Sequence, residues 1–375
     1  MRCVNADWLI VGAGFTGCTL AERIATQLNR KVVLVDRRPR VGGNAYDEYD
    51  DNGVLVHRFG PHIFHTNSTK VFDYLSTFTE WRAYEHRVQV AIGGRKVPAP
   101  FNLNSLHSLF PAPEAAEMEG LLAGTYGEGA KVPILKMREH PHPRVRKLAE
   151  FIYENVFYGY TLKQWGLAPE DLDPSVTGRV PVHISRDDRY FQDRFQTMPA
   201  AGYSALFQRM LRHPNIEIVL NCDHRAAHGI RFRRMIYTGP IDEFFDYVHG
   251  ELPYRSIRFD FLTAQEEWHQ GCGTVNYPND YEYTRITEQK YLSGQSLPKS
   301  TLVVEYPEAH VRGRNEPYYP VPREENRNRY ERYLRELRAL NGSVVMAGRL
   351  ADYKYYNMDQ AVARAMKVFE EEVAG

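Results

Sequence analysis

The feature that most constrains the fold is a glycine-rich turn near the N-terminus, GAGFTG at Gly12 to Gly17. It follows the short apolar run Trp8 to Val11, which predicts a buried strand. It opens the segment Ala13 to Leu28, whose apolar residues recur with helical periodicity, and Lys31 to Val35 then predicts a second strand. Together these segments form a βαβ unit, for which we expect a right-handed crossover.

An acidic residue, Asp36, closes the second strand at the position where dinucleotide-binding units carry one. In such units the first glycine makes the turn, the second admits a pyrophosphate and the third lets the helix pack on the strand. The helix N-terminus then faces the anion, and the acid holds the ribose hydroxyls. A purely structural turn gives no reason for Asp36. We therefore predict a dinucleotide site that includes Gly12, Gly14, Phe15, Gly17, Asp36 and Arg37.

A second pair of glycines follows in RRPRVGGNAYDE, where Gly43 and Asn44 again permit a ligand to approach the backbone closely. This extension is typical of FAD sites. No later glycine cluster follows a strand, so we find no second dinucleotide site for a nicotinamide. The sequence therefore predicts a single-flavin protein with FAD as its cofactor and an external reductant.

The fold class expected is α/β, with three predicted domains. A Rossmann-like FAD-binding domain is built from both chain ends, residues 1–76, 200–240 and 341–375, because GSVVMAG and MDQAVARAMKVFEEEV restore βα character near the C-terminus. Residues 102–176 have helical periodicity and predict a helical lobe. Residues 77–101, 177–199 and 241–340 contain runs such as RSIRFDFLTA and TLVVEYP and a hairpin at Gly93 and Gly94, which predict an antiparallel sheet.

Composition excludes several classes of partner. Lysine plus arginine and aspartate plus glutamate each number 47, so no net field recruits nucleic acid or an anionic membrane. The four cysteines are scattered without metal-ligand spacing, which argues against a metal site or disulfides and fits a reducing cytoplasm. The N-terminal apolar run is too short for a signal peptide or membrane span. We expect a cytoplasmic protein without membrane insertion.

Fragments along the chain resemble the prokaryotic UDP-galactopyranose mutase family. They are GPHIFHT at 60–66, YTLKQWG at 160–166, GRVPVHISRDDRYF at 178–191, TRITE at 284–288, EPYYPVP at 316–322 and GRLADYKYYNMDQ at 348–360. With the N-terminal motif, the resemblance runs from Leu9 to about Met366. It implies an intramolecular isomerase that interconverts UDP-galactopyranose and UDP-galactofuranose for cell-surface polysaccharide biosynthesis, as a homodimer. N5 of reduced FAD would be the nucleophile at the anomeric carbon, with no net redox change.

The resemblance also implies a role for each site residue. Trp165 would lie on a mobile lid. Arg179, which also rides on the lid, and Arg285 would be catalytic because they grip the diphosphate. His62 and His65 would lie beside the isoalloxazine. The other substrate-binding residues implied are Phe157, Tyr160, Thr161, Trp165, Tyr190, Asn276, Tyr319, Tyr355 and Asn357, and Gly348 and Arg349 would belong to the second half of the flavin site. At the start of the last predicted helix, Met358 and Asp359 are further predicted cofactor residues, because free N–H groups there would face the flavin.

Simple chemistry supports these roles without settling them. Arginine's planar fork meets phosphate oxygens with two directed bonds, and tyrosine adds a neutral donor. Trp165 could instead fill the core of the helical lobe, the arginines could form surface pairs, and GPHIFHT could be a core turn. Which of Tyr353, Tyr355 and Tyr356 faces the diphosphate is open. Asn357 stands where many family members carry aspartate, which removes a negative charge near a dianionic substrate.

Three rival functions remain. The first is a flavin mutase acting on another nucleotide sugar, such as UDP-N-acetylgalactosamine or a dTDP-deoxysugar. The second is an FAD-dependent oxidase or amine oxidase, which shares the cofactor motif and the mixed architecture. The third is a nucleotide-binding scaffold that retains flavin without turnover.

Overall fold

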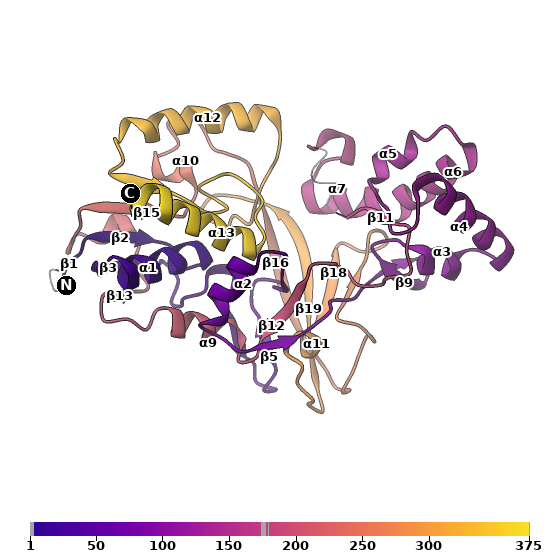
Figure 1. Cartoon of the computed structure of the whole chain (residues 1–375), viewed down its shortest axis with the longest axis horizontal. Coiled ribbons are helices and arrows are strands. Elements are labelled where there is room, and N and C mark those ends of the chain that lie inside the picture. Colours follow the sequence, from indigo (N-terminus) through magenta and orange to yellow (C-terminus); the bar gives the residue numbers. More distant parts are fainter. Residues whose placement is uncertain (1–3, 174–177, 179, 375) are drawn as a thin grey trace. The chain divides into compact units, whose positions relative to one another are not determined.

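The computed structural model describes residues 4–173, 178 and 180–374, and contacts within it divide the chain into two compact units (Figure 1). Unit 1 comprises Met1–Tyr84, Asp193–Tyr254 and His310–Gly375, and unit 2 comprises Glu85–Gln192 and Arg255–Ala309. The helical lobe and the antiparallel sheet therefore share unit 2. The three-domain boundaries drawn from the sequence stay a prediction.

Unit 1 is built on a five-stranded parallel sheet in the order β13-β3-β2-β15-β21. Its strands are β2 (Trp8–Val11), β3 (Val32–Val35), β13 (Ile216–Val219), β15 (Arg234–Tyr237) and β21 (Val344–Met346). All four residues of β3 are buried, as expected of a parallel strand covered on both faces. The sheet confirms the Rossmann-like fold, and β21 confirms that both chain ends build it.

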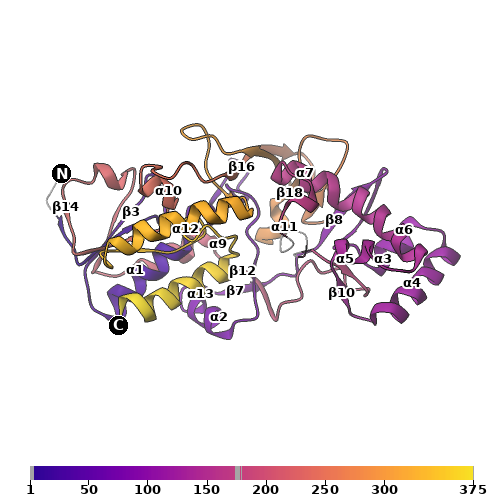
Figure 2. The same cartoon turned by 90° about the horizontal axis from the view of Figure 1, so that it is seen from above.

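Helices cover this sheet. In unit 1, α1 (Phe15–Gln27) lies beside α13 (Met358–Val368) (Figure 2). Tyr333 of α12 (Glu324–Ala339) is fully buried in a core with Leu9 and Val33 from the sheet. Unit 1 also contains α2 (Thr69–Ser76), α9 (Gly202–Met210), α10 (Ile241–Phe244) and an antiparallel sheet of β6 (Phe64–Thr66), β12 (Phe195–Pro199) and β7 (Trp81–Ala83).

The sheet of unit 2 is mostly antiparallel, as predicted. Strand β16 (Tyr254–Ala264) pairs with β19 (Ser300–Ala309), which pairs with β18 (Arg285–Glu288) and then β17 (Thr274–Asn276). The predicted hairpin forms from β8 (Val88–Ile92) and β9 (Arg95–Ala99), with positive φ at Gly93 and Gly94. One pairing differs from expectation, because β17 and β8 run parallel.

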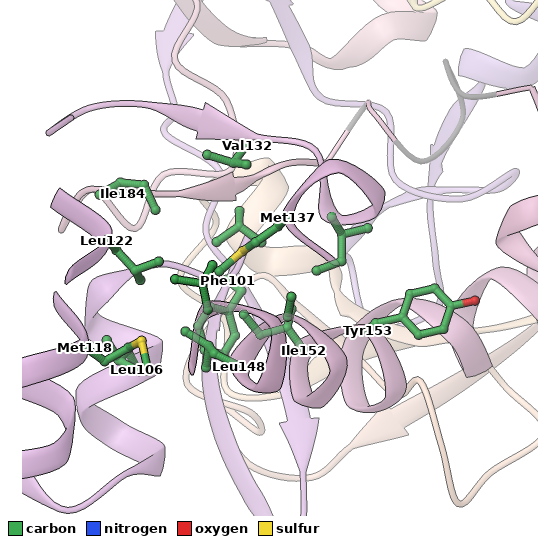
Figure 3. Close-up of a cluster of buried hydrophobic side chains, with 14 of the residues drawn as sticks. Phe101, Leu106, Met118, Leu122, Val132, Met137, Leu148, Ile152, Tyr153 and Ile184 are labelled. Atoms are coloured by element: carbon green, nitrogen blue, oxygen red, sulfur yellow. The ribbon is translucent and has the colours of Figure 1, made fainter. Parts of the chain in front are cut away.

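Unit 2 also contains the predicted helical lobe, whose bounds stay a prediction. It contains α3 (Leu103–Leu109), α4 (Ala112–Tyr126), α5 (Ile134–Arg138), α6 (Pro143–Ile152), a π-helical stretch η2 (Tyr153–Tyr158) and α7 (Gly159–Trp165). Figure 3 shows side chains of several of these elements, among them Leu106, Met137 and Ile152, gathered in one buried cluster. Among the helices described, none is both long and apolar enough to cross a membrane.

Candidate functional site

A cavity in unit 1 lies where the parallel strands end, between Val11 of β2, Tyr237 of β15 and the loop that begins at Gly348 after β21. Ligands of open α/β sheets bind at this edge of the sheet. The predicted cofactor residues that line the cavity are Gly12, Gly14, Phe15, Gly17, Asp36, Arg37, Gly43, Asn44, His62, Gly348, Arg349 and Met358. The cavity therefore gathers residues from both chain ends around one space.

The three glycines of the turn differ in whether the fold itself requires a glycine at that position. Gly12 has φ +101°, and a Cβ at Gly17 would stand 1.9 Å from the Gly12 carbonyl oxygen. The fold itself therefore requires these two glycines. Gly14 is different, since a Cβ there would come no closer than 3.7 Å to its nearest neighbour, the Cα of Gly43. The protein does not need a glycine at position 14, but a ligand in close contact with its backbone would.

Asp36 is held in place by backbone donors. Its Oδ2 accepts the Ala13 N–H at 2.8 Å and its Oδ1 accepts the Arg38 N–H at 2.8 Å. An ionised carboxylate has about four acceptor sites, so these two bonds fix its orientation and leave capacity for a ligand hydroxyl. The α1 N-terminus beside it has glycine as its N-cap and no acidic residue in its first turn. Its first N–H groups thus suit an anionic ligand.

A second wall of the cavity carries an ion-pair cluster. Glu316 accepts hydrogen bonds from Arg37 Nη2 at 2.9 Å and from Arg38 Nη2 at 3.2 Å, and Arg38 Nη1 donates to Asn44 Oδ1 at 3.0 Å. Burial raises the pKa of Glu316, but the two guanidinium groups outweigh burial and lower it overall. The cluster ties the loop after β3 to the segment that leads to Tyr319.

The two predicted histidines have different surroundings. His62 lines the cavity, its Nδ1 lies 2.8 Å from the Gly60 carbonyl oxygen, and its backbone N–H donates to His57 Nδ1 at 3.0 Å. His57 is 2% exposed, and burial lowers its pKa to about 4. His65 does not line the cavity, and its Nδ1 lies 2.9 Å from Asp193 Oδ2. Sequence reasoning missed His57, which carries no signal beyond its residue type.

The three tyrosines of the C-terminal stretch, residues 348–360, make different contacts. Tyr355 stacks on Tyr319, whereas the Tyr353 hydroxyl donates to the Pro253 carbonyl at 2.6 Å. Burial is the larger cause that raises the pKa of Tyr356. Asp352 also raises it and accepts a hydrogen bond from the Tyr356 hydroxyl. Of the three, Tyr355 is therefore the one that stacks on Tyr319, another predicted substrate-binding tyrosine.

The start of α13 follows the stretch directly. Asn357 is its N-cap, and its N–H donates to Gln360 Oε1 at 2.9 Å. Asn357 and Met358 line the cavity. Asp359 does not, because its Oδ2 accepts a hydrogen bond from the Thr66 hydroxyl at 2.9 Å.

Unit 2 holds the predicted substrate-binding residues other than Tyr319, Tyr355 and Asn357. Arg285 and Asn276 are register partners on β18 and β17. Arg285 Nε donates to Glu305 Oε1 at 2.6 Å, and Glu305 is 1% exposed. Sequence reasoning missed Glu305, although a lone acid within the apolar run TLVVEYP is a usable signal of a buried ion pair.

The predicted aromatic residues lie on two neighbouring helical segments of unit 2. Phe157 of η2 and Thr161 and Trp165 of α7 recur at four-residue spacing and are all buried, while Tyr160 is half-buried. The α7 C-terminus is held by Arg255, which donates to the Gln164 carbonyl at 2.8 Å and the Lys163 carbonyl at 3.0 Å. These bonds satisfy carbonyls that a helix end leaves unpaired.

Tyr190 is a further predicted substrate-binding residue of unit 2. The backbone N–H of Tyr190 donates to the His86 carbonyl at 2.8 Å, and the two rings meet edge to face with their centroids 5.9 Å apart. Arg179 lies outside the residues that the structure describes.

Comparisons with known proteins agree with this architecture. The sequence model of the family described as "UDP-galactopyranose mutase" matches residues 155–355, and that of the "NAD(P)-binding Rossmann-like domain" matches residues 10–78. A Klebsiella pneumoniae protein named "Probable UDP-galactopyranose mutase" is 35% identical over 98% of this chain and 94% of its own. An Escherichia coli dTDP-fucopyranose mutase is 33% identical over 96% of each chain.

Solved structures share the fold. The crystal structure of a reduced UDP-galactopyranose mutase superposes with a TM-score of 0.75, at 17% identity, over 99% of this chain and 94% of that one. A wild-type putrescine oxidase bound to putrescine superposes with a TM-score of 0.59, at 15% identity, over 99% and 100% of the two chains. At such identities the likeness concerns the fold alone.

Proposed function

Because this chain belongs to the UDP-galactopyranose mutase family of isomerases, we propose that it interconverts UDP-galactopyranose and UDP-galactofuranose on a reduced FAD cofactor. The observation that carries the proposal is the cavity of unit 1, which places the dinucleotide turn beside the stretch that carries Tyr355. A redox enzyme and an isomerase can share such a cavity, so the proposal rests on family membership together with the residues that surround it.

The residues present fit FAD. A Cβ on Gly14 would meet no protein atom closer than 3.7 Å, so a ligand can approach the backbone there. Asp36, at the end of β3, keeps acceptor capacity for ribose hydroxyls. The uncapped N-terminus of α1 would face the pyrophosphate. His62, Arg349 and Met358 line the cavity and would hold the rest of the cofactor. Bound FAD in its reduced form would supply N5 as the nucleophile that holds the anomeric carbon while the ring opens and closes.

The chain's own task is to bind the diphosphate and stabilise its charge as it leaves. We assign Arg285, with Arg179, to this role, because charge-assisted bonds from a planar guanidinium match phosphate oxygens. Glu305 holds the Arg285 guanidinium on β18 through a 2.6 Å hydrogen bond, so the donor is oriented before substrate arrives. Tyr319, Tyr355 and Tyr190 would add neutral phenolic donors.

The rest of the substrate would be held by residues of unit 2. Trp165 and Phe157 would contact the uridine side together with Tyr160 and Thr161, and Asn276 would complete the polar contacts. Both rings are buried among the protein's own side chains, and Phe157 belongs to the core cluster of the helical lobe. We leave His65 without a chemical role, since its ring is paired with Asp193.

A second candidate substrate is a dTDP-deoxysugar, because the dTDP-fucopyranose mutase relative, at 33% identity, falls between the 35% and 31% of the relatives named for UDP-galactopyranose. The same diphosphate contacts would serve both sugars. Following the dithionite-reduced protein by NMR with UDP-galactopyranose, UDP-N-acetylgalactosamine and dTDP-fucopyranose separates these substrates. We expect furanose product from UDP-galactopyranose at the highest kcat/KM. A higher value for dTDP-fucopyranose would replace the proposed substrate.

The oxidase alternative shares only the fold with this chain. It predicts oxygen consumption and peroxide with an amine substrate, and no need for dithionite. We further propose, from the family resemblance, a cytoplasmic homodimer that takes electrons from an external reductant and supplies galactofuranose for cell-surface polysaccharides. Sedimentation of the purified protein tests the dimer.

A further inference from the structure

Arg349 bridges two segments that are distant in sequence. Its Nη2 donates to the Tyr356 carbonyl at 2.7 Å and its Nη1 to the Tyr318 carbonyl at 3.4 Å. Each carbonyl belongs to the residue next to a predicted diphosphate tyrosine, Tyr355 in one segment and Tyr319 in the other. The guanidinium therefore fixes the backbone on both sides of this tyrosine pair.

The same guanidinium also lies against both rings. Its central carbon is 5.3 Å from the ring centroid of Tyr319 and 5.5 Å from that of Tyr355. The two rings stack at 4.8 Å with 8° between their planes. A cation within about 6 Å of a ring centroid attracts the ring electrostatically, so Arg349 stabilises the pair as a unit.

Arg349 is itself held rigidly. It follows Gly348, whose φ of +110° turns the chain at the end of β21. The Gly348 N–H donates to Asp352 Oδ2 at 3.1 Å, and the Arg349 carbonyl accepts the Lys354 N–H at 3.1 Å. Asp352 is in turn paired with Arg364 of α13. The backbone that carries the Arg349 side chain is thus anchored to the end of β21 and, through Asp352, to α13.

From this geometry we infer that Arg349 is a positioning residue, which holds Tyr319 and Tyr355 as one rigid pair of phenolic donors for the substrate diphosphate. The inference rests on the proposed function, since it takes the ligand of the pair to be a nucleoside diphosphate. It goes beyond a flavin contact, because it makes diphosphate affinity depend on the shape of the Arg349 side chain. A positive charge alone would be replaceable by lysine, whereas a planar fork that reaches two carbonyls is not.

A double-mutant cycle on nucleotide affinity tests this. UDP binding is measured by calorimetry on FAD-loaded wild type, Arg349→Lys, Tyr355→Phe and the double variant. We expect Arg349→Lys and Tyr355→Phe each to weaken UDP binding about tenfold. If Arg349 acts by positioning Tyr355, the double variant is also weakened only about tenfold, and independent action gives about a hundredfold.

Controls separate the possible failures. Arg312→Lys changes another arginine of unit 1, stacked 4.5 Å over Tyr247, which does not line the dinucleotide cavity, and should leave UDP affinity unchanged. Flavin absorbance and thermal unfolding report cofactor content and folding. If Arg349→Lys loses flavin, the cycle is repeated on the apoproteins. Pairing Arg349→Lys with Tyr355→Phe, and then with Tyr319→Phe, still gives the coupling between Arg349 and each tyrosine. Wild type that binds no UDP contradicts the proposed function. Wild type that binds UDP but shows additive effects, or an unaffected Arg349→Lys variant, overturns the positioning role.

Discussion

Tyr319 and Tyr355 stack face to face, with ring centroids 4.8 Å apart and 8° between their planes. The sequence leaves three tyrosines of the C-terminal stretch as candidates for the diphosphate. The stack favours Tyr355, which lies against Tyr319. The hydroxyl of Tyr353 instead donates a hydrogen bond to the Pro253 carbonyl.

Tyr355→Phe should therefore weaken UDP binding about tenfold, the effect of losing a hydrogen bond to a charged group. Tyr353→Phe is the matched control. It should leave UDP affinity unchanged and lower the free energy of unfolding by about 1 kcal/mol, because it removes the hydrogen bond to the Pro253 carbonyl. Calorimetric titration with UDP and thermal unfolding check both variants. The assignment is wrong if Tyr353→Phe is the variant that loses affinity.

Gly14→Ala should give a folded protein that does not retain FAD. The new Cβ would find ordinary contact distance to the protein but would occupy the ligand's place. Gly17→Ala should instead impair folding, since its Cβ would stand 1.9 Å from a carbonyl oxygen. Flavin absorbance and circular dichroism distinguish the two. A Gly14→Ala protein with full flavin content would show that no ligand approaches this backbone.

Arg285→Ala should lower kcat about a hundredfold to a thousandfold, as loss of a preorganised donor commonly does. It should also destabilise the fold by about 3 kcal/mol or more, because Glu305 would be left as an uncompensated buried carboxylate. The double variant Arg285→Ala/Glu305→Gln should recover most of this stability and stay inactive. Recovery of kcat to within about tenfold of wild type would show that Arg285 serves structure rather than catalysis.

Acid should release the cofactor through His57. Burial lowers its pKa from the ordinary 6.5 to about 4 in the folded protein. Between these two pH values the unfolded chain therefore binds a proton that the folded protein does not bind. Stability is therefore complete above about pH 6.5 and falls as pH drops toward 4, by up to about 3 kcal/mol. Protonated Nδ1 can no longer accept the N–H of His62, which lines the cavity.

His57→Gln should therefore retain flavin at lower pH than wild type. His183, in unit 2, is the control. Burial, and to a lesser extent the positive charge of Lys131, lower its pKa to about 4 as well. His183→Gln should change acid stability without changing flavin retention. Identical acid release curves for wild type and His57→Gln would exclude this mechanism.

Local patterns predicted the fold well. Apolar runs between turn residues located β2, β3 and β21, because a parallel strand buried on both faces must be apolar throughout. The first helix begins at Phe15 rather than at the predicted Ala13, since Ala13 donates its N–H to Asp36 and Gly14 is extended. The parallel pairing of β17 with β8 was not predictable, because it joins strands far apart in sequence.

The site was predictable where residue type alone expresses the chemistry. The glycine turn, Asp36 and the later glycines do so, and they line one cavity. The supporting contacts were not, because His57, Glu305 and the two carbonyls held by Arg349 act through distant partners. Arg179 lies outside the described residues, so its role stays a prediction.

The most direct test of the central claim is turnover of UDP-galactopyranose by one preparation in oxidised and in dithionite-reduced form, followed by NMR. We predict that UDP-galactofuranose forms only with the reduced protein, that the same equilibrium is reached from either sugar, and that no flavin is reoxidised by the substrate. Equal rates for both forms, or substrate-driven flavin reduction with peroxide release, would contradict a flavin-dependent isomerase.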